Sequence, residues 1–110
     1  MSAAEKHDVF QAIADPTRRR ILELLAKKDL AVTEISSQFP MSRTAVSKHL
    51  RILTEAKLVN GQKIGREKRY TLQPEPIKEM KNWLSYFDQY WDNKLQILQY
   101  LVEDEKRQDE

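Results

Sequence analysis

The sequence predicts a mainly α-helical domain with one small β-hairpin, with its elements in the order ααααββα. Apolar residues recur at spacings of three and four in several stretches, which is typical of helices that bury one face. Prolines at positions 16, 40 and 76 interrupt these stretches, and a glycine at position 65 lies between two short segments that suit a hairpin. A length of 110 residues fits one domain with a modest core.

Two helices are expected before residue 30. Apolar residues at helical spacing predict the first over residues 5–14, and Asp15 and Pro16 then interrupt it. Asp15 is a favourable N-cap and Pro16 suits the start of a second helix, from about Thr17 to Lys27. The arginines at positions 18 to 20 crowd its first turn, where the helix dipole disfavours cations. We interpret them as solvated side chains with local ion pairs; an anionic neighbour is the alternative.

The next two helices form a helix-turn-helix. Thr33 is expected to cap a short helix from Glu34 to Phe39, and Ser42 to cap a longer helix that ends near Ala56. Pro40 and Met41 separate the two. A short helix, a brief turn and an amphipathic helix with a polar outer face are typical of DNA-binding units. The same packing also occurs in proteins that do not bind DNA.

The helix from Arg43 to Ala56 has two unlike sides. Wound at about 100° per residue, its apolar residues fall on one arc, and its cations and hydroxyls fall on the other. Hydroxyls gain little from bulk water, so the polar arc suits phosphates and base edges. The candidate DNA contacts on this helix are Ser42, Arg43, Thr44, Ser47, Lys48 and Arg51. Arg43 is expected to reach a base edge, and Lys48 and Arg51 to bind phosphates. His49 falls on the apolar arc, and we interpret it as a packed, hydrogen-bonded core histidine rather than a ligand.

A basic hairpin follows this helix. Two short strands, at about residues 58–63 and 68–72, flank a turn at Gly65, and cations lie at the tip and along the second strand. The candidate DNA contacts here are Arg66 and Lys68. Such a wing can reach a minor groove or the flanking phosphates while the helix occupies the major groove. A sheet edge kept soluble by charge is the alternative. Tyr70 is expected to pack under the wing with its hydroxyl bonded to a partner.

A long last helix is expected from about residue 75 to 102. Its apolar side chains fill a broad arc that a domain of this size cannot cover with its own core, so the surplus is expected to bury in a second copy of the chain. The candidate interface residues on it are Trp83, Phe87, Trp91, Leu95 and Leu98. Trp83 and Trp91 could also line an apolar effector pocket. Residues 1–102 are thus expected to form one domain, and residues 103–110 a solvated tail.

The charge of the chain is unevenly distributed. Residues 42–69 carry eight basic and two acidic side chains, a net charge of +6, whereas residues 1–41 balance and residues 70–110 carry a net −4. Such a local excess suits a polyanion, most often nucleic acid, although a solvated basic surface is the alternative. The chain lacks cysteine, which excludes disulfides and thiolate metal sites. Since no run approaches the ~20 apolar residues of a membrane span, we expect a cytoplasmic protein without membrane insertion.

Three runs of sequence resemble the ArsR family of winged helix-turn-helix transcriptional repressors. They are ADPTRRRILELL, LAVTEISSQFPMSRTAVSKHLRILTEAKLV and GREKRYTL, and the resemblance covers about residues 8–73. The first run resembles the branch of small autorepressors without obvious metal sites. The resemblance implies a homodimer built from the first and last helices, which adds Val9 and Phe10 to the candidate interface. It also implies a winged helix-turn-helix fold that binds two half-sites of an inverted repeat, about one helical turn apart.

Metal-responsive members of this family carry Cys-x-Cys in the third-helix region. Ala31 and Thr33 hold the matching positions here, and the last helix has Asp88 and Asp92 but no histidine. Carboxylates without imidazole or thiolate make a poor transition-metal site. The resemblance therefore supports DNA binding without a metal or other cofactor.

The sequence predicts a DNA-binding transcriptional repressor that acts as a homodimer on double-stranded DNA. The alternative is a winged-helix adaptor for protein–protein interaction, or an anti-repressor partner, since winged helices sometimes bind proteins. An unknown effector or protein partner could control either. An enzyme would need a nucleophile–base pair, a metal cluster or a phosphate-cradling loop. The chain has no cysteine, no histidine pair and no glycine-rich loop, so we expect no catalytic residues.

Overall fold

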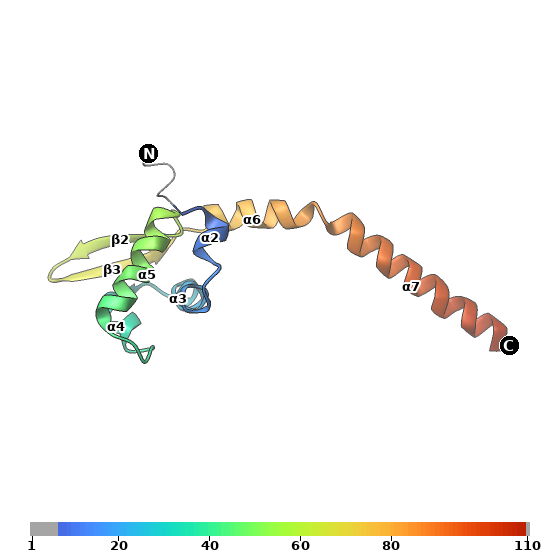
Figure 1. Cartoon of the computed structure of the whole chain (residues 1–110), viewed down its shortest axis with the longest axis horizontal. Helices are drawn as coiled ribbons and strands as arrows, with labels where there is room; N and C mark the ends of the chain where they lie inside the picture. Colours follow the sequence, from blue (N-terminus) through green and yellow to red (C-terminus); the bar gives the residue numbers. More distant parts are fainter. Residues whose placement is uncertain (1–6, 110) are drawn as a thin grey trace. The chain divides into compact units, whose positions relative to one another are not determined.

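The computed structural model describes residues 7–109, the last three by their backbone alone. Its elements are α2 (Val9–Ala12), α3 (Pro16–Lys27), β1 (Leu30–Ala31), α4 (Val32–Ser36), α5 (Arg43–Glu55), β2 (Val59–Ile64), β3 (Glu67–Leu72), α6 (Glu75–Ser85) and α7 (Asp88–Asp109) (Figure 1). The described residues group into two compact units, one ending at Met80 and the other beginning at Lys81. The predicted fold class, mainly α-helical with a small hairpin, is confirmed.

The N-caps that begin α3 and α5 are the predicted ones. An oxygen of the Asp15 carboxylate accepts the Arg18 backbone N–H at 3.0 Å, and Ser42 Oγ accepts the Ala45 N–H at 3.1 Å. Each cap satisfies one of the N–H groups that have no partner inside the helix. Residues 5 and 6 of the helix predicted over 5–14 lie outside the described residues; of the rest, only Val9–Ala12 is helical, and Asp8 caps it with its carboxylate 2.7 Å from the Gln11 N–H.

The helix-turn-helix begins differently from the prediction. The first helix of the pair, α4, runs from Val32 to Ser36 and follows β1 directly, so Thr33 lies inside the helix and does not cap it. The Thr33 hydroxyl instead donates to a Glu67 carboxylate oxygen at 3.4 Å, and the Glu34 carboxylate accepts the Ala31 N–H at 2.9 Å. The pairing of β1 with β3 holds the chain extended up to Ala31, which sets the earlier start.

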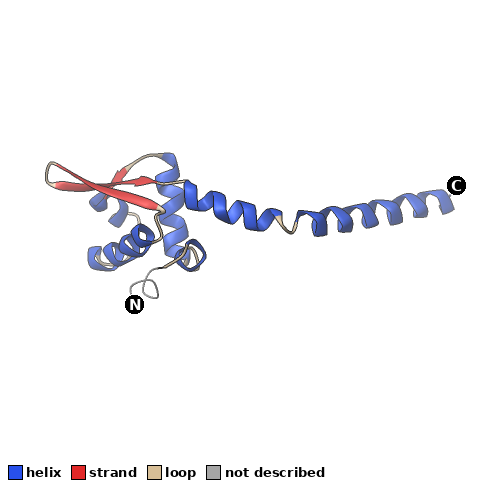
Figure 2. Cartoon of the chain, turned by 90° about the horizontal axis from the view of Figure 1, so that it is seen from above, coloured by secondary structure: helices blue, strands red, loops and turns tan. Residues whose placement is uncertain are grey.

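The sheet has three antiparallel strands in the order β1-β3-β2. The β2–β3 hairpin is the predicted wing and forms the long two-stranded ribbon in Figure 2. Gly65 occupies its turn with a φ of 65°, a conformation that glycine adopts without steric cost. Strand β1 is an addition to the prediction: Leu30 pairs with Tyr70, so β3 lies between the two other strands.

Helix α5 ends in a Schellman motif that contains no glycine. Lys57 has a φ of 62°, its N–H donates to Thr54 O at 3.0 Å, and the Leu58 N–H donates to Leu53 O at 2.9 Å. Leu53 and Leu58 are both fully buried, which is the apolar contact that usually accompanies this motif. The burial of Leu58 thus anchors the end of the helix against the sheet.

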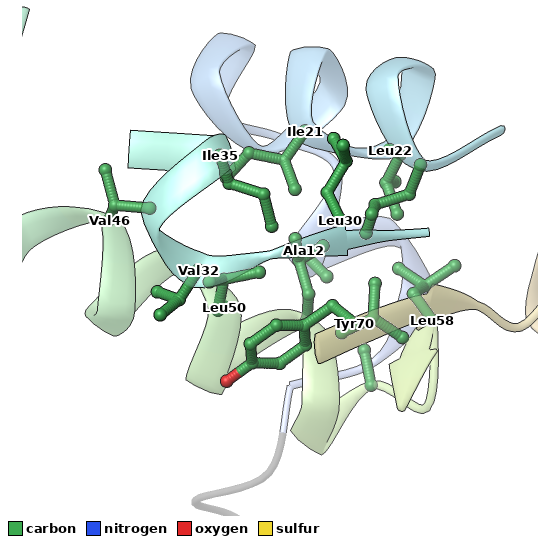
Figure 3. Close-up of a cluster of buried hydrophobic side chains, with 14 of the residues drawn as sticks. Ala12, Ile21, Leu22, Leu30, Val32, Ile35, Val46, Leu50, Leu58 and Tyr70 are labelled. Carbon is green, nitrogen blue, oxygen red and sulfur yellow. The ribbon is translucent and has the colours of Figure 1, made fainter. Parts of the chain in front are cut away.

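The core of the first unit lies between α3, α4, α5 and the sheet (Figure 3). Its fully buried large side chains are Ile21, Ile35, Val46, Leu50, Leu53 and Leu58. Val9 is also in this core and is only 3% exposed. It is therefore not available for the dimer interface, in which the sequence analysis placed it. Phe10, on the same helix, is 37% exposed, and its place at an interface stays a prediction.

The predicted long last helix is wrong in two respects. It is divided into α6 and α7 by a turn at Tyr86 and Phe87, and α7 continues through the expected tail to Asp109. The Tyr86 and Phe87 N–H groups bond the carbonyls three residues before them, which tightens and ends α6. Asp88 then stands in the first turn of α7, where an acidic residue is favourable. Residues 103–109 contain neither glycine nor proline, so no residue of either type ends α7 at the predicted position.

Candidate nucleic-acid interface

The polar arc of α5 has two parts. Arg43, Ser47 and Arg51 line a groove of about 420 Å³ whose opposite wall is formed by Lys68 and Tyr70 on β3. The remaining candidates on this helix are exposed but do not line the groove; they are Ser42, Thr44 and Lys48. The arc that the sequence predicts as one surface therefore has one side turned toward the wing and one side turned away from it.

Most cations of this region have no acidic partner. The side chains of Arg43, Lys48 and Arg66 are exposed, and among residues 7–109 they make neither a hydrogen bond nor an ion pair. Arg51 lies 4.0 Å from Glu55 in a helical pair whose arginine is exposed and whose carboxylate is half-buried, and such a long contact contributes little to stability. The Lys68 ammonium lies over the Tyr70 ring, 5.6 Å from its centroid. These charges remain available to a polyanion.

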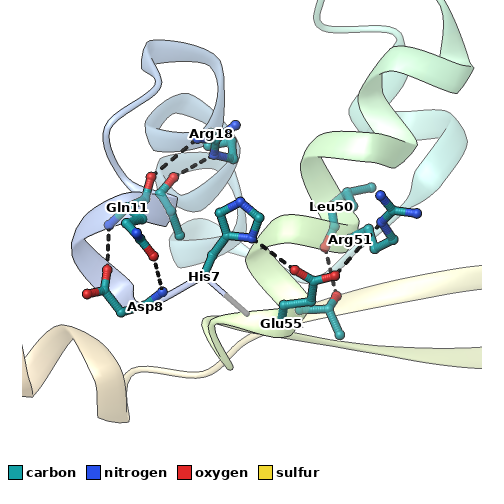
Figure 4. A network of polar contacts seen from close by, with 9 residues as sticks. His7, Asp8, Gln11, Arg18, Leu50, Arg51 and Glu55 are labelled. Atoms are coloured by element: carbon teal, nitrogen blue, oxygen red, sulfur yellow. Dashed lines mark hydrogen bonds and ion pairs between the residues drawn. The ribbon is translucent and has the colours of Figure 1, made fainter. Parts of the chain in front are cut away.

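The interpretation of the α3 arginines as solvated holds for Arg19 and Arg20, which are exposed, whereas Arg18 is part-buried; Arg18 and Arg19 also bond to backbone carbonyls, which the sequence did not predict. Arg18 Nε donates to Ala12 O at 2.6 Å and Arg19 donates to Ile13 O at 2.8 Å (Figure 4 shows Arg18). The end of α2 carries partial negative charge, which offsets the unfavourable position of these cations at the start of α3. Arg20 forms the expected local pair, 3.8 Å from Glu23.

His49 lies in a polar contact between α5 and the start of α3. It is part-buried, and Arg18 donates to its Nδ1 at 3.2 Å, with an Asp15 oxygen 3.9 Å from the same nitrogen. The predicted hydrogen bond is thus confirmed, whereas the predicted core position is wrong, because His49 is only part-buried and lies outside the buried cluster. Desolvation raises the pKa of Asp15, but the hydrogen bond from the Arg18 N–H, the electrostatic attraction of His49 and Arg18 and the hydrogen bond from the Thr17 N–H outweigh it and lower that pKa below 3.8.

Asp15→Ala is expected to lower the free energy of unfolding by about 1 kcal/mol at pH 7, through loss of the N-cap. Asp15→Asn retains a capping oxygen and should retain most of that stability. Because the folded-state pKa of Asp15 is depressed, the contribution of its charge is present above 3.8 and is lost as pH falls through the folded value. Urea unfolding at pH 7 and pH 3 measures both effects. Equal stability of Asp15→Ala and wild type at pH 7 would contradict the capping role.

The wing is held by contacts that the sequence did not indicate. Arg69 lies 3.6 Å from the Glu34 carboxylate and donates to Asp29 O at 3.3 Å. Together with the contact between Thr33 and Glu67, these bonds tie β3 to the segment around β1 and α4. Arg69 thus anchors the wing, while Lys68 lies at the groove.

Sequence comparison places the helix-turn-helix in a known family. A family model described as "Bacterial regulatory protein, arsR family" matches residues 15–61. The transcriptional repressor SdpR of Bacillus subtilis (strain 168) is 36% identical over 89 residues, which are 81% of this chain and 99% of SdpR. The chain belongs to the ArsR family. The HTH-type transcriptional regulator Rv2034 of Mycobacterium tuberculosis is 38% identical over 87% of each chain.

The fold of solved ArsR-family structures agrees with this assignment. An ArsR-like transcriptional regulator from Rhodococcus sp. RHA1 superimposes with a TM-score of 0.65 and 32% identity, and the match covers 91% of this chain and 94% of that one. The resemblance inferred from the sequence is therefore confirmed, and so is the function of a DNA-binding transcriptional repressor at the level of the family. The individual DNA contacts and the homodimer stay predictions.

Within residues 7–109, no group of three or more His, Cys, Asp or Glu side chains is placed to hold a metal ion. None of the helices in this range combines the length and apolar character that crossing a bilayer requires.

Proposed function

We propose that this ArsR regulator represses transcription as a homodimer bound to an inverted repeat in duplex DNA. Each subunit inserts α5 into a major groove and sets the tip of the β2–β3 hairpin on the adjacent backbone or minor groove. The observation that carries the proposal is the set of cations on the outer side of α5 and on the hairpin that have no acidic partner among residues 7–109. Such a regulator acts in the cytoplasm, where bacterial DNA lies, and the proposal gives it no catalytic activity.

The contacts divide by position. Arg43, in the first turn of α5, reaches a base edge, and Thr44 and Ser47 contact bases or phosphates. Ser42 uses its oxygen as the N-cap, so its hydroxyl hydrogen remains free to donate to a phosphate. The phosphate-binding cations are Lys48, Arg51, Arg66 and Lys68.

The homodimer is supported by the apolar surface of α6 and α7. Trp83, Trp91, Leu95 and Leu98 are all more than half exposed, far more apolar area than a stable monomer usually presents. In α7, residues 91, 95, 98 and 102 are apolar and spaced by four, three and four, the pattern of a helix that packs along a partner helix. A two-fold dimer through this stripe presents two α5 helices to the two halves of a palindrome.

The rival proposal is a protein-interaction adaptor, and the same aromatic surface favours it. An adaptor does not need unpaired cations on α5, whereas a DNA-binding repressor does. Substitutions on α5 therefore separate the two, because they change DNA affinity only if α5 binds DNA.

Arg43→Ala is expected to weaken DNA binding by about 1–3 kcal/mol and to relax sequence preference, since a base contact is lost. The probe is a duplex selected from a random pool by the wild-type protein, with a scrambled duplex for comparison. Binding is measured by fluorescence anisotropy at several salt concentrations.

Two other variants calibrate this result. Lys48→Ala and Arg66→Ala remove phosphate contacts and should weaken both duplexes equally, with the salt slope reduced by about 1. Arg20→Ala is the matched control, because Arg20 is exposed and paired with Glu23 away from α5. Unchanged DNA affinity in all three α5 and wing variants would favour the adaptor.

A further inference from the structure

The hydroxyl of Tyr70 is a polar group at the groove that has no hydrogen-bond partner among residues 7–109. Tyr70 is only 6% exposed and its ring packs in the core, yet it also lines the groove between α5 and β3. In Figure 3 its oxygen lies at the outer edge of the cluster, away from the aliphatic side chains. Within residues 7–109 this hydroxyl makes no hydrogen bond, contrary to the sequence expectation. Among the described residues, Ser36 Oγ is the one buried side-chain oxygen without a hydrogen-bond partner, so the Tyr70 hydroxyl reaches solvent at the groove, where a ligand can accept its hydrogen bond.

The surroundings of this hydroxyl are rich in donors. The groove is lined by Val32, Arg43, Ser47, Arg51, Thr54, Lys68 and Tyr70. Of these described residues none is acidic, and three carry positive charge. A ligand that fits such a lining accepts hydrogen bonds and is anionic, as a phosphodiester is.

Strand β2 leaves space for the Tyr70 ring and the Lys68 side chain. Gly61 on β2 pairs with Tyr70, and a Cβ at Gly61 would lie 2.8 Å from Tyr70 Cε1 and 2.7 Å from Lys68 Cε. Any side chain at this position would push the tyrosine ring or the lysine from its place. On the other side β1 pairs with Tyr70 through Leu30, so the ring is held in the central strand before DNA arrives.

We propose that the Tyr70 hydroxyl donates a hydrogen bond to a phosphate oxygen of the DNA backbone seated in this groove. The strand of DNA that separates the major groove from the minor groove would then pass between α5 and the wing. This inference rests on the proposed function. Tyr70 is a neutral donor, so its contribution is to fix the position of the backbone, and it releases no counterion.

The test compares Tyr70→Phe with Lys68→Gln on the selected duplex and the scrambled duplex. Tyr70→Phe is expected to lower affinity for both about 10- to 100-fold, the range for a hydrogen bond to a charged group, without changing the salt slope. Lys68→Gln is expected to lower affinity for both and to reduce the slope by about 1. Tyr70→Phe should unfold at the same urea concentration as wild type, because the hydroxyl makes no hydrogen bond to any of residues 7–109.

A second measurement locates the contact. In the selected duplex, methylphosphonate linkages replace one phosphate at a time, which removes its charge. One position should weaken wild-type binding and leave the binding of Tyr70→Phe nearly unchanged, because that contact is already lost. Unchanged affinity of Tyr70→Phe, reduced stability of this variant, or a loss confined to the selected duplex would each overturn the inference. Failure of wild type to bind either duplex would instead overturn the proposed function on which it rests.

Discussion

Leu98→Glu is expected to convert the homodimer into a monomer and to lower affinity for the inverted repeat at least 100-fold. Leu98 is 58% exposed in α7 and lies in the stripe formed by residues 91, 95, 98 and 102. A carboxylate there would have to be desolvated in the interface, which costs more than the dimer gains at that position. A monomer also loses the effective concentration that makes the second half-site contact intramolecular, a factor of about 10² to 10⁴.

Light scattering at micromolar concentration and anisotropy with one-site and two-site duplexes measure these effects. Leu98→Glu should bind a single half-site as wild-type subunits do, since its α5 is unchanged. Gln96→Glu adds the same charge to α7 outside the stripe and should remain dimeric. A Leu98→Glu variant that scatters light as a dimer would exclude this stripe as the interface.

Local signals in the sequence were enough to place α3, α5 and the hairpin. Asp15 and Ser42 are caps whose partners lie three residues away, and Gly65 supplies the turn conformation by itself. Strand β1 could not be found in this way, because two residues have no periodicity and Leu30 becomes a strand only by pairing with Tyr70. The end of α5 at Lys57 is similar, since a lysine adopts a left-handed conformation there only because Leu58 is buried.

The candidate site shows the same limit. Helical winding was enough to separate the exposed side of α5 from its buried side, because that needs only the helix period. The division between Arg43, which lines the groove, and Lys48, which does not, depends on where β3 lies. The burial of Val9 and the carbonyl partners of Arg18 likewise depend on contacts between separate elements. Sequence patterns indicate which residues lie near one another within a single helix or strand. The groove, the burial of Val9 and the partners of Arg18 depend instead on contacts between different helices and strands.

Leu50→Ala is expected to lower the free energy of unfolding by about 2–5 kcal/mol. Leu50 is 0% exposed and anchors the middle of α5 in the cluster with Ile21, Ile35 and Leu58. Truncation removes buried methyl groups and leaves a cavity that a close-packed core fills only in part. Against a typical stability of about 5–15 kcal/mol, this loss is large. Urea unfolding at a fixed protein concentration measures it, because dimerisation makes apparent stability depend on concentration.

Lys48→Ala, two residues earlier on the same helix, distinguishes anchoring from DNA binding. Lys48 is exposed and unpaired within residues 7–109, so its truncation should change stability by less than about 0.5 kcal/mol while weakening DNA binding. Leu50→Ala should show the reverse, with near wild-type affinity per folded molecule once the unfolded fraction is subtracted. Such opposite results would show that one side of α5 maintains the fold and the other binds DNA. A loss of intrinsic DNA affinity in Leu50→Ala equal to that of Lys48→Ala would contradict this division, because it would mean that the orientation of α5 depends on Leu50 even in the folded protein.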